Sequence, residues 1–196
     1  IIAGPTADVS ANAGNKPYNI ENVSPDAHLA PSVGDSSSKT SSKAWHKIDG
    51  VCYNGSGKKV EGAITRGMDV SEWQGKINWK EAKKDLDFAF VRISYGTRHL
   101  DDYYDYNMTE AEAADVPVGT YVYSLAKTNK EALAEAQLAI RQMQGHKVSY
   151  PVAFDLEDEA TLGTLTRKEI SQIALTFCDE IRKAGYTPIL YMNLNW

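Results

Sequence analysis

The chain has 196 residues, a formal net charge of −5 and an apolar fraction of 42%, enough for one sizeable globular domain. The mild negative charge offers no basic surface for nucleic acid or for an anionic membrane. No apolar run approaches the roughly 20 residues that span a bilayer. We therefore expect neither a nucleic-acid partner nor insertion into a membrane.

Two cysteines, Cys52 and Cys178, are too few for a disulfide framework. We expect them to be buried thiols, with a reactive or bridging role as the alternative. The four histidines are scattered, and none has a metal-ligand spacing to another histidine, cysteine or glutamate. The sequence therefore predicts no metal site and no cofactor.

The first part of the chain differs in composition from the rest. Residues 1–44 are rich in Ser, Ala, Asn, Pro and Gly, and predict a linker or an extended arm because they cannot bury enough apolar surface to offset chain entropy. Residues 45–66 carry two turn signals, Asp49-Gly50 and Asn54-Gly55, between short apolar stretches. They predict a small hairpin unit, either packed on the main domain or faintly resembling one repeat of the hairpin modules that bind bacterial cell walls.

From Gly67 onward, apolar strand-like segments alternate with amphipathic helical segments. Strands are predicted at 68–70, 88–93, 118–123, 152–154 and 187–191, with helices starting near residues 78, 103, 128 and 166. Five strands alternating with four helices favour a parallel α/β architecture. No glycine-rich phosphate loop follows the first strand, which argues against a nucleotide-binding sheet. The pattern by itself does not separate a doubly wound sheet from a barrel.

Two acids follow the fourth predicted strand, at Asp155 and Glu157. Residues two apart on an extended chain point the same way, so both carboxyl groups face the mouth of a barrel. Burial and mutual repulsion raise one pKa, which keeps a proton available near neutral pH for glycosidic cleavage. A solvated acidic loop, or a cation site using Asp155, Asp158 and Glu159, is the alternative. Asp69 ends the first strand, where it is either a third acid at the same mouth or a helix cap.

An ordered set of motifs along residues 67–193 resembles glycoside hydrolase family 25, the N-acetylmuramidase lysozymes of bacteria and phage. The matching segments are Gly67-Met68-Asp69-Val70-Ser71-Glu72-Trp73-Gln74-Gly75, Ile77-Asn78-Trp79, Phe88-Ala89-Phe90-Val91-Arg92, Asp101 with Asn107, residues 118–124, residues 151–158, Phe177-Cys178, Ala184-Gly185-Tyr186 and Tyr191-Met192-Asn193. Each segment by itself is weak evidence for the resemblance, whereas the ordered set of segments is specific to the family. One departure is Ala114-Asp115, where the family usually has Ala-Gly, and we expect it to affect only a helix cap.

The resemblance implies an irregular, TIM-like β/α barrel of which residues 67–196 supply the first five strands, or about the N-terminal two-thirds. The family continues through roughly three more strands and a further active-site Asp. We therefore expect an open sheet edge in residues 67–196, and doubtful activity of this piece by itself.

The resemblance also implies the reaction, which is hydrolysis of the β-1,4 bond from N-acetylmuramic acid to N-acetylglucosamine in peptidoglycan. Glu157 resembles the catalytic acid/base, Asp155 the partner of the substrate 2-acetamido group or of the cationic transition state, and Asp69 a supporting acid. Retention through the substrate's own acetamide is the expected route, with a covalent aspartyl intermediate as its competitor.

Four further residues match positions that the resemblance places near the substrate: Tyr123, Tyr191, Asn193 and Arg92. The three uncharged side chains contact sugar or only pack the barrel, and Arg92 binds substrate or neutralises the acids. The implied location is secreted or cell-wall associated. Two other functions compete: a non-catalytic peptidoglycan-binding module, disfavoured by the intact acid pair, and a metal-dependent hydrolase, disfavoured because no histidine supports the acids.

Overall fold

The computed structural model describes residues 2–3 and 45–192. The chain divides into two compact units, Ile1–Gly67 and Met68–Trp196, which we describe separately. The predicted arm over residues 1–44 lies almost wholly outside the described residues.

In the first unit, β2 (His46–Ile48) and β3 (Val51–Tyr53) pair antiparallel. Asp49 and Gly50 join them with φ angles of 48° and 79°. A two-residue turn with both φ angles positive matches the right-handed twist of the strands it connects, and Asp-Gly is a favoured sequence for it. β1 (Ile2–Ala3) pairs antiparallel with the first residues of β4 (Thr65–Val70).

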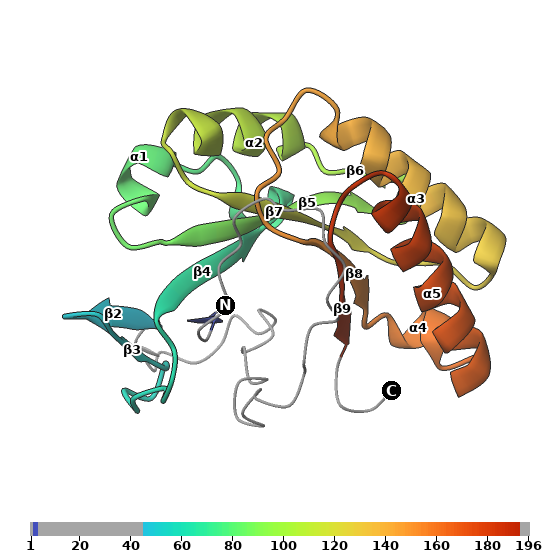
Figure 1. Ribbon diagram of the computed structural model, residues 1–196, viewed down its shortest axis with the longest axis horizontal. Helices are drawn as coiled ribbons and strands as arrows, with labels where there is room; N and C mark the ends of the chain where they lie inside the picture. The colour runs from blue at the N-terminus through green and yellow to red at the C-terminus, as the bar shows by residue number, and fades with distance from the viewer. Residues whose placement is uncertain (1, 4–44, 193–196) are drawn as a thin grey trace. The chain divides into compact units, whose positions relative to one another are not determined.

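The second unit is built on a sheet in which β5 (Phe88–Tyr95), β7 (Val118–Tyr123), β8 (Val152–Leu156) and β9 (Pro188–Met192) run parallel in that order. β4 borders β5 on the other side, and the short β6 (His99–Leu100) pairs antiparallel with β5. The sheet is curled like half of a barrel, with α2, α3 and α5 on its convex face (Figure 1). This mixed α/β arrangement agrees with the predicted fold class.

The helices are η2 (Glu72–Gln74), α1 (Trp79–Ala82), α2 (Tyr104–Ala113), α3 (Asn129–Met143), α4 (Glu159–Leu162) and α5 (Arg167–Lys183). Of these, α1, α2, α3 and α5 begin where the sequence predicts helices. The side chains of Asn78, Thr128 and Thr166 each accept the backbone N–H three residues on, as N-cap residues do. The Glu169 side chain accepts the Thr166 backbone N–H at 2.7 Å, which completes a capping box. The helices η2 and α4 and the strand β6 were not predicted, because segments of two to four residues carry too little periodicity.

The core lies between the helices and the convex face of the sheet. Phe154 of β8 stacks on Phe177 of α5 with ring centroids 4.0 Å apart, and both side chains are fully buried. Cys178 on the same helix and Cys52 in the first unit are both buried and belong to no disulfide, which confirms the prediction of buried thiols. Asp115 has a φ of 54° just after α2, so an acid holds the left-handed position that glycine favours.

Aromatic side chains fill the concave face near the start of the strands. Phe88 stacks on Tyr150 at 4.8 Å, and Phe90 meets the same ring edge-on at 6.4 Å. Gly119 makes room for this cluster, because a Cβ there would lie 2.7 Å from the Phe90 ring and 2.5 Å from the Pro151 carbonyl oxygen. The open part of the concave face is therefore at the carboxyl ends of the strands.

β9 forms the edge of the sheet within the described part of the chain, where no strand pairs with its outer side. Large apolar side chains on this strand are accordingly exposed: Ile189 (38%), Leu190 (46%) and Tyr191 (48%). Buried parallel strands are apolar on both faces, so this edge has the composition of a strand made to be covered. The structure therefore shows the open edge that the sequence predicts.

Candidate active site

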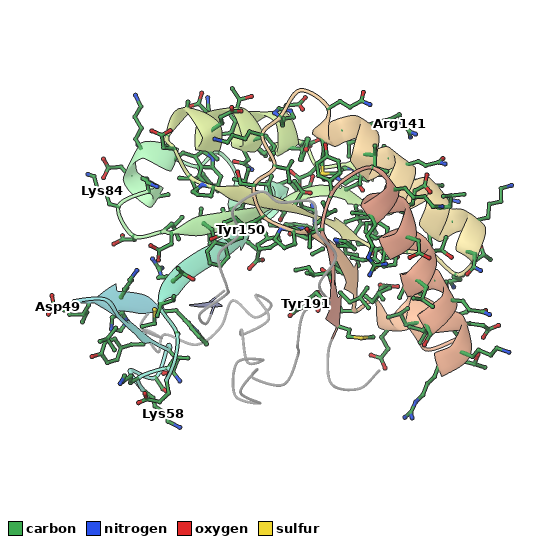
Figure 2. The ribbon with its side chains drawn as sticks, in the orientation of Figure 1. Asp49, Lys58, Lys84, Arg141, Tyr150 and Tyr191 are labelled. Carbon is green, nitrogen blue, oxygen red and sulfur yellow. The ribbon has the colours of Figure 1, made fainter. Side chains whose placement is uncertain are left out.

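Strand register brings three predicted site residues side by side. Asp155 of β8 pairs with Tyr123 of β7 and with Tyr191 of β9. Asp155 belongs to the strand itself, which runs two residues further than predicted. Tyr191 projects from the sheet on the side away from α3 and α5 (Figure 2). All three side chains therefore share the concave face.

Asp155 is the most buried of the predicted catalytic acids, with 7% of its surface exposed. Burial, and then the charges of Glu157 and Asp69, raise the pKa of Asp155 to about 8, while Arg92 acts in the opposite direction. Its Oδ1 atom is buried and accepts no hydrogen bond from any residue that the structure describes. An unpaired buried acceptor is costly, so this oxygen is suited to receive a donor from a ligand.

Glu157 follows β8 and is half-buried, so its carboxyl group is more open to solvent than that of Asp155. Burial, and then the charge of Asp69, raise the pKa of Glu157. Asp69 on β4 is exposed, yet its charge acts on both other acids, so the three carboxyl groups lie near one another. The structure thus brings together the three acids that the sequence singled out. Acids that are buried close together retain a proton near neutral pH. Here Asp155 and Glu157 share that proton, because the ionisation of one affects the other.

Tyrosines border the acids on both sides. Burial, and then the charges of nearby acids, raise the pKa of Tyr123 and of Tyr191. Tyr121 lies one level lower on β7, in register with Arg92 and Ala153, and burial likewise raises its pKa. These hydroxyl groups stay protonated at neutral pH and can both donate and accept hydrogen bonds. Tyr121 was not among the predicted site residues, although its spacing of two from Tyr123 places it on the same face of the strand.

Arg92 is held in a buried ion-pair network. Its Nε donates to Asp101 Oδ2 at 2.9 Å, and its Nη2 lies 2.9 Å from Glu72 Oε1. Asp101 Oδ2 also accepts the Glu72 backbone N–H at 2.8 Å. Only 5% of Arg92 is exposed. Its guanidinium is therefore suited to moderate the charge of the acids, which is the second of the two roles considered for it.

Among the described residues, the side chains best placed to bind a metal ion do not include the acid pair. Within the described residues, Glu72, His99 and Asp102 bring ligand atoms to within 4.8 Å of one another, a grouping that sequence spacing does not reveal. Glu72 is already paired with Arg92, and a guanidinium at 2.9 Å disfavours a cation there. Asp158, part of the alternative cation site, accepts the Thr161 N–H at 2.8 Å as the N-cap of α4. Asn193 lies outside the described residues.

A second buried carboxyl group supports the loop after Tyr123. Glu135 on α3 accepts the Ser124 hydroxyl at 2.7 Å and the Leu125 backbone N–H at 3.0 Å. Ser124 in turn donates its backbone N–H to the Asp155 carbonyl at 2.9 Å. Burial raises the pKa of Glu135 to about 7, against the two hydrogen bonds, which lower it.

We predict that this carboxyl group makes stability depend on pH. The unfolded chain ionises Glu135 near its ordinary pKa of 4.5, whereas the native state keeps it neutral up to about pH 7. Below pH 4.5 this difference in pKa does not change the free energy of unfolding. As the pH rises from 4.5 to 7, it lowers the free energy of unfolding by up to roughly 3 kcal/mol. Glu135→Gln keeps an acceptor for Leu125 and cannot ionise. Urea unfolding from pH 4 to pH 8 should show the variant gaining stability over the wild type across this window, and parallel curves would contradict the prediction.

Comparison with known proteins decides the family. A model of the glycosyl hydrolases of family 25 matches residues 68–196, which include the whole acid group. The chain belongs to glycosyl hydrolase family 25. Membership in this family places the chain among the glycoside hydrolases.

Two curated proteins are similar to parts of this chain. The uncharacterized protein YegX of Escherichia coli K12 is 26% identical over 64% of this chain and 47% of its own length. Lysozyme M1 of Streptomyces globisporus is 38% identical over 30% of this chain and 20% of its own length. The chain spans about half the length of YegX and less of the other relative.

Solved structures share the fold. The family 25 glycosyl hydrolase from Bacillus anthracis superposes with a TM-score of 0.61 at 23% identity, covering 78% of this chain and 66% of that chain. The modular autolysin LytC from Streptococcus pneumoniae, solved with a synthetic peptidoglycan ligand, gives a TM-score of 0.58 at 21% identity, covering 74% of this chain and 43% of that chain.

Proposed function

We propose that this chain is the acid-bearing part of a lysozyme that hydrolyses the β-1,4 bond between N-acetylmuramic acid and N-acetylglucosamine in peptidoglycan. The observation that carries the proposal is the coupled pair of Asp155 and Glu157 at the mouth of the concave sheet, with Asp69 nearby. Family membership, the likeness to Lysozyme M1 and the peptidoglycan ligand of LytC support this substrate class.

In the first step, Glu157 donates its proton to the glycosidic oxygen as the C1–O bond breaks. The carbonyl oxygen of the 2-acetamido group attacks C1, and an oxazolinium ion forms while the shortened sugar chain leaves as an alcohol. In the second step, Glu157, now a carboxylate, removes a proton from water as the water oxygen attacks C1. The acetamide is regenerated, the product keeps the original anomeric configuration, and Glu157 is protonated again.

Asp155 is proposed to hold the acetamido group in position for this attack. Its unpaired, buried Oδ1 can accept the acetamido N–H. A hydrogen bond donated to the carboxylate favours its ionised form, so substrate binding lowers the pKa of Asp155. The proton retained by the pair then resides on Glu157, the more exposed of the two acids. Glu157 is therefore the acid that we assign to the leaving oxygen.

A covalent aspartyl intermediate is the competing route, in which Asp155 itself attacks C1 instead of holding the acetamido group. Asp69 contributes negative charge that stabilises the cationic transition state. Tyr123 and Tyr191 flank Asp155 in register, where their hydroxyl groups can bind the substrate sugar. A non-catalytic wall-binding module would have no use for the buried, proton-retaining pair.

The test of this proposal is digestion of purified peptidoglycan by the full-length protein, followed by NMR at early times. We expect a falling turbidity and newly released sugar ends in the β configuration, which later mutarotate. Initial release of the α-anomer would contradict the acetamide route, and no release would contradict the function.

We predict that chelation leaves wall cleavage unchanged, because the proposed steps use only carboxyl groups, water and the substrate. The measurement is the rate of turbidity loss before and after treatment with EDTA and desalting. A loss of activity that magnesium or calcium restores would favour the acid cluster as a cation site instead.

The proposed site of action is the cell wall, outside the cytoplasmic membrane, where the substrate lies. Among the described helices, none combines the length and apolar character needed to cross a bilayer.

A further inference from the structure

The loop after β7, residues 124–126, lies where the ends of three parallel strands meet. The Ser124 backbone N–H donates to the carbonyl oxygen of Asp155 on β8 at 2.9 Å. The N–H of Gly96, just after β5, donates to the carbonyl oxygen of Tyr123 at 2.8 Å. Tyr123 and Asp155 are themselves partners in the strand register. The backbone of this loop therefore sets the position of the main chain at both residues.

A single side chain from the other face of the sheet holds this loop. Helix α3 packs on the convex face (Figure 1), and its Glu135 is only 2% exposed. One Glu135 oxygen accepts the Ser124 hydroxyl at 2.7 Å, and the other accepts the Leu125 N–H at 3.0 Å. The Ser124 hydroxyl oxygen in turn accepts the Ala126 N–H at 3.1 Å. All three residues of the loop are therefore tied, directly or through Ser124, to one carboxyl group.

Glu135 is a costly choice for this position if folding alone is considered. The other buried side chains of α3 are apolar, namely Ala132, Ala136, Ala139 and Met143. A buried carboxyl group loses its hydration, which an apolar side chain of similar size would not. Residues that break the pattern of an otherwise apolar helix face are expected at functional sites. Glu135 breaks that pattern directly beneath the loop that joins Tyr123 to Asp155.

The hydrogen bonds give this side chain a route to the reaction geometry. Without Glu135, the Leu125 N–H and the Ser124 hydroxyl would lose their acceptors, and the loop would move to find others. Any shift of Ser124 changes its bond to the Asp155 carbonyl oxygen, at the residue proposed to hold the acetamido group. Groups that orient a substrate must be held to within a fraction of an ångström, because a displacement of about 1 Å can cost about 100-fold in rate.

We propose that Glu135 is a positioning residue for the reaction, which acts through the loop of residues 124–126 on Tyr123 and Asp155. This role rests on the proposed function, because it is defined by the reaction that Asp155 serves. Glu135 lies on the helix side of the sheet and contacts no substrate. It fixes the spacing of the β7 and β8 ends, so that the hydroxyl group of Tyr123 and the carboxyl group of Asp155 meet the sugar together.

The test compares two uncharged replacements of similar length in the full-length protein, Glu135→Met and Glu135→Gln. Met fills the space without accepting either hydrogen bond, whereas Gln keeps an oxygen for the Leu125 N–H and an amide group beside the Ser124 hydroxyl. At pH 6, below the pKa of about 7 of Glu135, the wild-type carboxyl group is also mainly neutral. The measurements are kcat and KM for soluble, uncrosslinked peptidoglycan strands, each corrected for the folded fraction.

We expect Glu135→Met to lower kcat at least about tenfold, with a much smaller change in KM. Glu135→Gln should recover most of the lost kcat. Ser124→Ala, which changes the volume least, should lower kcat in the same direction. Ile140→Ala is the control for a general loss of stability, because Ile140 packs against the core further along α3. It should lower the melting temperature and leave kcat per folded molecule unchanged.

Hydrogen exchange gives a second measurement that does not depend on activity. The amide of Leu125 should exchange faster in Glu135→Met than in the wild type, Glu135→Gln or Ile140→Ala, because only the Met variant removes its acceptor.

Unchanged kcat in Glu135→Met and in Ser124→Ala would overturn the positioning role. An equal loss in the Gln variant or in Ile140→Ala would also overturn it, because the hydrogen bonds would then not be the cause. In these cases wild-type cleavage leaves the proposed function intact. If the wild type cleaves no peptidoglycan, the proposed function fails and the role in the reaction fails with it, while faster exchange at Leu125 would still show that Glu135 holds the loop.

Discussion

Replacing Glu157 with Gln should slow peptidoglycan cleavage by the full-length protein at least ~100-fold, the usual worth of a general acid. Gln keeps the shape of the side chain and has no proton to transfer to the leaving oxygen. Binding to wall fragments should survive, because Gln keeps a carbonyl oxygen in the same place. The measurement is the initial rate of release of reducing ends, together with a sedimentation assay of binding to insoluble walls.

Glu159→Gln provides the matched control for this variant. Glu159 lies two residues further on, at the exposed start of α4. Its replacement by Gln is the same chemical change made outside the group of three acids. We expect it to cleave at close to the wild-type rate. Activity of Glu157→Gln within a few-fold of the wild type would remove Glu157 from the role of acid.

Residues 67–196 expressed alone should fail to form an active, cooperatively folded monomer. The outer edge of β9 has no partner among the described strands, and its exposed apolar side chains have the composition of a buried strand. An open edge leaves backbone N–H and C=O groups unpaired and apolar surface exposed to water, and it favours association with other copies of the chain.

Three measurements test this prediction together: thermal melting, size-exclusion chromatography and wall lysis. We expect a broad or absent melting transition, association in solution and no lysis. A compact monomer that melts cooperatively and lyses walls would show that the edge needs no cover and that the half-barrel is sufficient for activity.

Much of the second unit could be predicted from sequence, because its long strands and helices carry strong local signals. Thr166 and Glu169 mark the start of α5 by side-chain chemistry alone, and the structure confirms the capping box. The alternation of side chains along a strand likewise predicted that Asp155 and Glu157 share one face of the sheet. These features depend only on residues a few positions apart, which is why the sequence reveals them.

The remaining parts of the site depend on contacts between distant segments. Glu72 reaches Arg92 and His99 only because β6 folds back on β5, and no spacing along the chain records that approach. Glu135 lies in a helix whose periodicity does not distinguish a surface glutamate from one that is buried beneath the loop after β7. Tertiary packing, rather than local propensity, therefore decides which polar residues join the site.

The most direct test of the proposed reaction is the identity of the sugar at the ends released from purified peptidoglycan. The digest is reduced with borohydride, hydrolysed and analysed by mass spectrometry, which distinguishes the two reduced amino sugars. We predict that the new ends are reduced N-acetylmuramic acid, and that Glu157→Gln releases at most ~1% as many in the same time. Reduced N-acetylglucosamine at the new ends, or free peptides without any new sugar ends, would contradict the proposed cleavage of the muramic acid bond.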